Sequence, residues 1–241
     1  CASALVPLVV KAALEFRIHE QKFIGVTGPI ASGKTTAARA LVNHLTNLSI
    51  DAHHIAIDDL VRALYEEDSL GAQAVRNQII ARFGQDIAEH NNTAINTHAL
   101  TRALFSGTPE TVAEHRAFLE TLTAPHVMRL FRNAVHGKSG FFFVEWSDYV
   151  SQNLLPLVNN TVILIDTDDD TRAHYATQRG IEPELFAAIN NTQRTTAEMH
   201  TFIQHAHTAG THGRCIVMNQ ETPEDAVIEH ILSIQSLPFT S

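Results

Sequence analysis

The amino-acid sequence predicts an α/β fold in which a five-stranded parallel sheet is covered by helices on both faces. Two observations support this fold class. Short, continuously apolar runs alternate along the chain with stretches whose apolar residues recur at helical spacing, which is typical of parallel strands buried on both sides. A glycine-rich segment separates the first apolar run from the first helical stretch, and glycine allows the tight turn that such a connection needs.

The predicted strands occupy residues 23–26, 55–57, 141–144, 162–165 and 215–218, and each is a short apolar run. Helices are expected over 35–45, from the second strand through Leu64, and over about 223–234. A long, mostly helical middle is expected from 72 to about 136, with interruptions at 83–84 and 107–109. No linker is rich enough in Gly, Pro or Ser to divide the chain, so we expect one domain over 22–236.

The two ends of the chain are expected to lie outside this domain. Residues 1–21 are interpreted as an N-terminal extension with a short helix over 8–16, and residues 237–241 as a C-terminal tail. The apolar run at 2–10 is broken by Pro7 and is much shorter than the roughly 20 residues of a membrane helix. A lipoprotein beginning at Cys1 is an alternative to the cytoplasmic location that we expect.

Composition and charge exclude several classes of protein. With 241 residues, of which 44% are hydrophobic, the chain can bury a core and is not expected to be disordered. Its net charge of −9 argues against a nucleic-acid partner, because Lys and Arg supply phosphate contacts. Its two cysteines, Cys1 and Cys215, form no disulfide framework, which favours a reducing compartment. We expect neither a nucleic-acid nor a membrane partner.

Residues 28–35, with the sequence GPIASGKT, match the phosphate-binding pattern G-x-x-x-x-G-K-[ST] at every fixed position. The glycines let backbone N–H groups point inward, and the N-terminus of the following helix adds its dipole. Lys34 would bridge the β- and γ-phosphates, and the Thr35 hydroxyl would hold Mg²⁺. A nucleoside triphosphate is therefore expected to bind the loop residues Gly28, Pro29, Ile30, Ala31, Ser32, Gly33, Lys34, Thr35 and Thr36.

Other motifs narrow the class of P-loop protein. The base-reading motif N-K-x-D is absent, and the only D-x-x-G, at 68–71, follows a helical stretch, so a GTPase is not expected. What remains is phosphoryl transfer to a small molecule. In that chemistry an acid near the γ-phosphate orients and deprotonates the acceptor hydroxyl.

Three predicted strands are each followed by an acid, namely Asp58, Glu145 and Asp166. Ligands bind at the carboxyl ends of such sheets, so all three acids are candidates. Asp166 leads into a run of aspartates that favours helix capping, and capping is also an alternative role for Asp58. Arg62 lies four residues after Asp58 and would share its helix face, either toward the acceptor or as a solvated ion-pair partner.

The chain resembles the dephospho-CoA kinases, P-loop enzymes that phosphorylate the ribose 3′-hydroxyl of dephospho-CoA to complete coenzyme A. The loop reads TGPIASGKTT from Thr27, and IAIDDLVR from Ile55 is similar to the family's I-D-A-D-x-x-x-R, with Ala56 in place of the first acid. Similar segments begin at Phe83 (FGQDI) and Leu119 (LETLTAP), and the likeness runs from about residue 23 to 234.

The resemblance implies ATP and Mg²⁺ and assigns a role to each candidate residue. Asp58 falls on the family's catalytic acid and would orient or deprotonate the acceptor hydroxyl. Lys34 and Arg179 would stabilise charge on the transferring phosphoryl group. Arg62 and Glu145 would bind the small-molecule acceptor, dephospho-CoA. The region at about 72–136 would bind the acceptor, and a lid at about 170–195 would exclude water.

The chain departs from the family where the acceptor and lid are expected. Residues 146–151 (WSDYVS) replace a P-L-L-F-E-type run, Tyr175 stands where the first lid arginine is expected, and Thr97 replaces an arginine of the middle helix. A kinase for another nucleoside or nucleotide, and a nucleotide-binding module without catalysis, are therefore alternatives. The histidines at 200–212 are irregularly spaced and are expected at the surface rather than around a metal.

Overall fold

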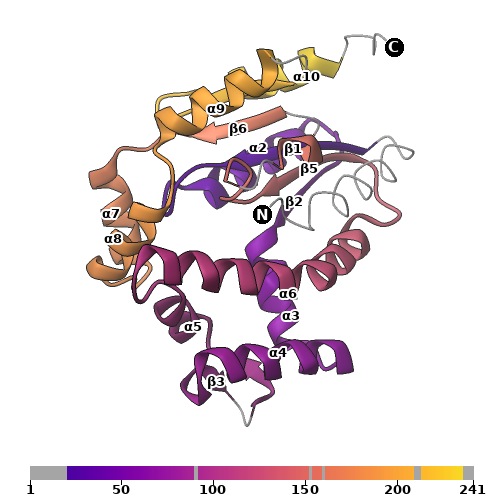
Figure 1. The fold of residues 1–241 in the computed structure, drawn as a ribbon. Helices are drawn as coiled ribbons and strands as arrows, with labels where there is room; N and C mark the ends of the chain where they lie inside the picture. The colour runs from indigo at the N-terminus through magenta and orange to yellow at the C-terminus, as the bar shows by residue number, and fades with distance from the viewer. Residues whose placement is uncertain (1–20, 90–91, 152–153, 159–160, 209–212, 236–241) are drawn as a thin grey trace.

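The computed structural model describes residues 21–89, 92–151, 154–158, 161–208 and 213–235. At its centre is a five-stranded parallel sheet with the strand order β2-β5-β1-β6-β7 (Figure 1). The strands are β1 (Gln21–Thr27), β2 (Ala52–Ala56), β5 (Gly140–Glu145), β6 (Thr161–Ile165) and β7 (Arg214–Met218). The predicted fold class is therefore confirmed.

One face of the sheet packs against α2 (Lys34–Asn47) and α10 (Glu224–Gln235). Successive strand residues point to opposite faces, so alternate residues enter this layer. From the strands these include Ile24, Val26, Phe141, Phe143 and Ile163, and from the helices Leu41, Leu45, Val227 and Ile231.

The opposite face is covered by α6 (Pro109–Val135), α9 (Thr196–Thr208) and the short 3₁₀ helix η4 (Leu155–Val158). Phe142 and Val144 of β5 and Val162 and Leu164 of β6 pack into this second layer. Because both faces are buried, β5 and β6 read as continuous apolar runs in the sequence. The edge strand β2 is less buried and contains His53 and His54.

The chain between β2 and β5 forms a helical layer beneath the sheet in Figure 1. It contains α3 (Ile57–Glu66), α4 (Leu70–Phe83), the 3₁₀ helix η2 (Gln85–Ile87), the short strands β3 (Ala88–Glu89) and β4 (Ala94–Ile95), α5 (Thr97–Leu104) and α6. The guanidinium of Arg76 is buried here and donates to the carbonyl groups of Tyr65, Glu67 and Asn92. This layer forms one wall of the site described below.

Two further helices, α7 (Asp169–Gln178) and α8 (Pro183–Thr192), follow β6. The Asp168 carboxylate accepts a hydrogen bond of 2.8 Å from the Thr171 N–H at the start of α7. Helix capping is thus confirmed as the role of the aspartate run. Asp166 is exposed and does not line the cavity described below.

The structure corrects three local predictions. The second strand ends at Ala56 rather than at Ile57, which is the first residue of α3. Asp58 is not the N-cap of α3: Ala56 holds that position, and Asp58 lies in the first turn, where an acid still favours the helix dipole. The antiparallel pair β3–β4 interrupts the helical middle, and strands of two residues leave no periodic signal.

The predicted helix at 8–16 and the tail at 237–241 lie outside the described residues. Within the described ranges, no helix combines the length and the apolar character needed to cross a membrane.

Candidate active site

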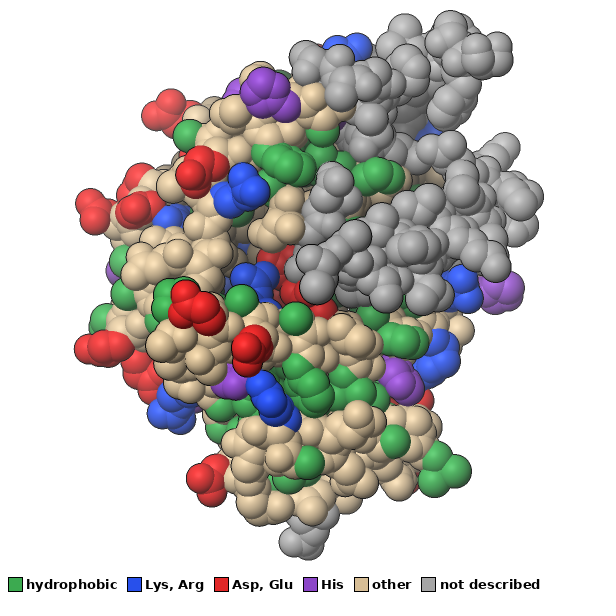
Figure 2. All heavy atoms as spheres, viewed as in Figure 1, with side chains coloured by type: hydrophobic (Ala, Val, Ile, Leu, Met, Phe, Trp, Pro, Cys, Tyr) green, Lys and Arg blue, Asp and Glu red, His purple; other side chains and the backbone are tan. Residues whose placement is uncertain are grey.

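A cavity of about 1000 Å³ opens at the carboxyl ends of the sheet strands, bordered by the phosphate loop, the helical layer and α8. Figure 2 shows basic and acidic side chains together in the hollow at the centre of this face. The Lys, Arg, Asp and Glu residues that line the cavity are Lys34, Arg39, Asp58, Asp59, Arg62, Arg116, Glu120, Glu145, Asp148 and Arg179. The structure therefore brings the five predicted charged site residues into one cavity.

The phosphate loop leaves β1 and enters α2 at Lys34. Gly28 has φ 149°, and a Cβ there would lie 2.8 Å from the carbonyl oxygen of Ile165. Only glycine fits this position, because the loop passes directly over the end of β6. Ala31 and Gly33 also have positive φ values, 58° and 90°. The hydroxyl of Thr167 donates to the Ser32 carbonyl at 2.8 Å and ties the loop to the segment after β6.

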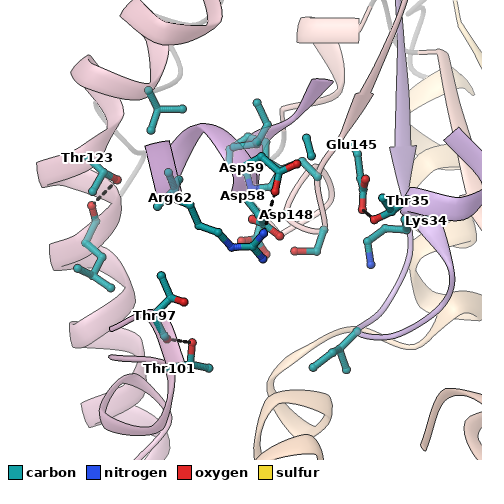
Figure 3. Close-up of a pocket in the computed structure, with 18 of the residues that line it drawn as sticks. Lys34, Thr35, Asp58, Asp59, Arg62, Thr97, Thr101, Thr123, Glu145 and Asp148 are labelled. Atoms are coloured by element: carbon teal, nitrogen blue, oxygen red, sulfur yellow. Dashed lines mark hydrogen bonds and ion pairs between the residues drawn. The ribbon is translucent and has the colours of Figure 1, made fainter. Parts of the chain in front are cut away.

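Lys34 folds back over its own loop. Its Nζ donates to the carbonyl oxygens of Gly28 at 3.1 Å and Pro29 at 2.8 Å, and the side chain points into the cavity (Figure 3). Burial of the ammonium lowers the pKa of Lys34 to about 8, although the negative charges of Glu145 and Asp58 oppose this shift. Lys34 is thus a desolvated ammonium group, placed where an anion entering the cavity would stabilise its charge.

Beside it, a chain of hydrogen bonds joins the loop to the sheet. The Thr35 hydroxyl donates to Glu145 Oε1 at 2.7 Å, and His54 Nε2 lies 2.9 Å from Glu145 Oε2. Desolvation raises the pKa of Glu145, but the hydrogen bonds from His54 and Thr35 and the charge of Lys34 outweigh it, so the net shift is downward. Glu145 is therefore held as a carboxylate.

Asp58 lies across the cavity from the phosphate loop, in the first turn of α3 (Figure 3). The surrounding protein raises the pKa of Asp58 by desolvation, and the positive charge of Lys34 opposes the rise. The side chain is still exposed to the water of the cavity, which limits the desolvation. A carboxylate with a raised pKa that lines a cavity is suited to accept a proton.

The partner of Arg62 differs from the prediction. Its guanidinium lies 2.8 Å from Asp59 Oδ1, three residues earlier, and both side chains are more than half exposed. Arg62 nevertheless lines the cavity on the side of the helical layer. An exposed ion pair of this kind is weak, so Arg62 can leave Asp59 and bind an anionic group of a ligand instead.

A second ion pair in the cavity was not predicted. Arg116 of α6 lies 3.0 Å from Asp148 in the segment after β5, and both side chains are only 22% exposed. Asp148 is one of the residues of the 146–151 segment that differ from the family pattern. This pair joins the segment after β5 to the helical layer.

The residues of the predicted lid are divided between the cavity and the surface. Arg179 ends α7 and lines the cavity, and its charge contributes to the lowered pKa of Lys34. Tyr175 does not line the cavity, and its hydroxyl instead accepts a hydrogen bond of 3.2 Å from Gln220. Thr97, at the start of α5, does line it.

The histidine-rich part of α9 contributes nothing to this cavity. Among the described residues, no group of three or more His, Cys, Asp or Glu side chains is arranged to hold a metal ion, and His212 lies outside them.

The middle strand of the parallel sheet leads through a glycine-rich loop into a helix that begins with a lysine, and an acid lies across the cavity from that lysine. This arrangement defines a P-loop kinase. Comparison with known proteins gives the particular family. Residues 22–205 match the family model of dephospho-CoA kinase, and the chain belongs to the dephospho-CoA kinase family.

The individual relatives have low sequence identity to this chain. The dephospho-CoA kinase of Vibrio cholerae is 27% identical over 176 residues, which cover 73% of this chain and 80% of that protein. The dephospho-CoA kinase of Vibrio parahaemolyticus is 27% identical over 156 residues, 65% of this chain and 69% of that protein. The crystal structure of TT1252 from Thermus thermophilus has a TM-score of 0.63 at 18% identity and covers 91% of this chain and 100% of that one. The last likeness supports the fold alone.

Proposed function

We propose that this chain transfers the γ-phosphoryl group of ATP to the 3′-hydroxyl of dephospho-CoA, the last step of coenzyme A biosynthesis. The observation that carries the proposal is the position of Asp58, which lies across one cavity from Lys34 at the carboxyl ends of the sheet strands. The chain that forms this sheet belongs to the dephospho-CoA kinase family. Membership of the family supports the choice of donor and acceptor.

Asp58 acts on the acceptor in this proposal. Its carboxylate accepts the proton of the 3′-hydroxyl while that oxygen forms a bond to the γ-phosphorus and the bond from phosphorus to the ADP oxygen breaks. Lys34 and Arg179 bind the phosphoryl oxygens as negative charge shifts toward ADP. The fixed N–H groups of the loop bind the β-phosphate without reorganising.

Thr35 and Glu145 would hold Mg²⁺. Both present hard oxygen atoms, 2.7 Å apart, and Glu145 remains ionised because its pKa is lowered, which suits this cation. When bound, Mg²⁺ neutralises charge between the β- and γ-phosphates. This assignment moves Glu145 from the acceptor, where the sequence had suggested it, to the nucleotide. Arg62 would bind the anionic groups of the acceptor.

The ion pair of Arg116 and Asp148 favours a second candidate function, a kinase for a different nucleoside or nucleotide. It lies in the wall that an acceptor would contact, within a segment that departs from the family pattern. The Asp148 carboxylate, whose charge Arg116 compensates, would accept hydrogen bonds from acceptor hydroxyl groups.

One assay separates the two candidates. The purified protein is supplied with ATP, Mg²⁺ and one acceptor at a time from a panel of dephospho-CoA, nucleosides and nucleotides, and ADP release is followed in a coupled assay. We expect dephospho-CoA to give the highest kcat/KM, with coenzyme A identified by mass spectrometry. ADP release with another acceptor but none with dephospho-CoA would establish the second function. ATP binding without turnover on any acceptor would contradict both.

Replacement of His54 should affect the reaction through Glu145. His54→Ala removes one of the two hydrogen bonds that orient this carboxylate, and we expect kcat/KM to fall about 10-fold, as for other residues that orient metal ligands. His54→Gln, whose amide can donate to the same oxygen, should recover most of the loss. His53→Ala is the control, because His53 packs on Phe142 and contacts the Ser139 carbonyl rather than the site. Equal activity of His54→Ala and wild type would contradict the role.

A further inference from the structure

Both main-chain polar groups of one phosphate-loop residue are hydrogen-bonded to side chains of the predicted lid, which comprises α7 and α8 and is called the lid helices below. The Ile30 N–H donates to Gln193 Oε1 at 2.7 Å, and the Ile30 carbonyl accepts a hydrogen bond of 3.2 Å from Arg172. Arg172 lies in α7, and Gln193 is the residue at which α8 ends. The contacts span 142 and 163 positions of the sequence, so they join two separate parts of the fold.

Arg172 is fixed by its surroundings as firmly as a core residue. It is only 4% exposed. Besides the Ile30 carbonyl, its guanidinium donates to Asn190 Oδ1 at 2.8 Å and to Asp169 Oδ1 at 2.5 Å, and it lies 5.8 Å from the ring of Phe186. A buried guanidinium bound by two lid helices and by the loop allows little independent movement of any of the three.

The loop needs such support. Ala31, the residue after Ile30, has φ 58°, a left-handed conformation that is unfavourable for any residue with a Cβ. Residues held in such conformations persist only where neighbouring contacts determine them. Within the loop, Lys34 donates to the Gly28 and Pro29 carbonyls. From outside the loop, the contacts are those of Arg172 and Gln193 to Ile30 and that of Thr167 to Ser32.

We propose that Arg172 and Gln193 are positioning residues that hold the phosphate loop in its anion-binding conformation, so that the affinity for the nucleotide phosphates depends on the lid helices. Neither side chain has to touch the nucleotide. Because the same helices carry Arg179 at the end of α7, binding of the phosphates also fixes the lid, since coupling between two sites is reciprocal. The inference rests on the proposed binding of ATP to this loop.

Two conservative variants test the proposal. Gln193→Met keeps the size of the side chain but removes the acceptor for the Ile30 N–H, and Arg172→Lys keeps the charge but cannot reach Ile30, Asn190 and Asp169 together. Arg194→Met is the matched control, because Arg194 adjoins Gln193 but its guanidinium lies over Phe202, 5.3 Å from the ring centre. Dissociation constants for Mg–ATP and for inorganic tripolyphosphate are measured by calorimetry without acceptor, together with the melting temperature of each free protein.

We expect both variants to weaken the binding of both ligands by about 10-fold, the effect of losing one hydrogen bond to a fixed main-chain group, and the control to stay within about 2-fold of wild type. Because tripolyphosphate has no base or ribose, its weaker binding identifies the loop as the affected part. Unchanged affinity in Gln193→Met, which is not expected to impair folding, would overturn the proposal, and so would a loss confined to Mg–ATP. A wild-type protein that does not bind Mg–ATP would instead overturn the proposed function itself.

Discussion

Asp58→Asn is expected to lower kcat for phosphorylation of dephospho-CoA by about 10²- to 10⁴-fold, the usual contribution of general acid–base catalysis. The amide has nearly the same shape as the carboxylate but cannot accept the proton of the acceptor hydroxyl. The dissociation constant for Mg–ATP should change little, because the phosphate loop is untouched. Rates from a coupled ADP assay and binding constants from calorimetry separate the two effects.

The control for this variant is Asp68→Asn, which removes an exposed acid whose side chain contacts only Gln73 among the described hydrogen bonds. The pH dependence gives an independent check. Since the pKa of Asp58 is raised, the wild-type rate should fall on the acid side at a higher pH than an ordinary aspartate would cause. An Asp58→Asn enzyme with the full rate would show that the acceptor loses its proton without this carboxylate.

Lys34→Met is expected to abolish binding of Mg–ATP and, at the same time, to stabilise the free protein at neutral pH. Binding is expected to be lost because the variant lacks the ammonium group proposed to bind the β- and γ-phosphates. Stability increases because burial lowers the pKa of Lys34 from 10.5 to about 8. Below about pH 8 the folded protein carries the full cost of this desolvated charge.

The sign of the effect follows from proton counts. Between about pH 8 and 10.5 the Lys34 side chain is protonated in the unfolded chain but deprotonated in the folded protein. The free energy of unfolding of the wild type therefore rises with pH across this range. Thermal unfolding across this range should therefore show the advantage of Lys34→Met shrinking as the pH rises. Lys22→Met, which alters an exposed lysine of β1, is the control. A variant less stable than wild type at neutral pH would contradict the account.

The sequence predicted the sheet and the phosphate loop well because both depend on local signals. A buried parallel strand is a short apolar run, and the loop is a continuous motif whose conformation follows from its glycines. Even so, the boundary after β2 was displaced: Ile57 continues the apolar run of the strand, yet its side chain packs as part of α3. Apolar character alone does not distinguish the last residue of a strand from the first of a buried helix.

The residues that sequence reasoning missed are those whose role depends on distant partners. His54 reaches Glu145 because β2 and β5 are paired in a register that sets Ala56 opposite Glu145, two residues beyond His54. Asp148 was noticed only as a departure from a family pattern, and its partner Arg116 is 32 positions away. Such pairs follow from tertiary packing, which no local pattern encodes.

The order of the strands also determines whether the proposed nucleotide site or the proposed acceptor site is lost first when the protein partially unfolds. β1, which ends at the phosphate loop, is paired on both sides, by β5 and β6, so its amide hydrogens should exchange with solvent only when the whole sheet unfolds. In the helical layer α6 packs on the sheet, but α3, α4 and α5 form a separate apolar cluster. We expect this cluster, which carries Arg62, to open at a lower free energy than the sheet. We therefore expect partially unfolded molecules to retain the nucleotide half of the site after the acceptor half has been lost.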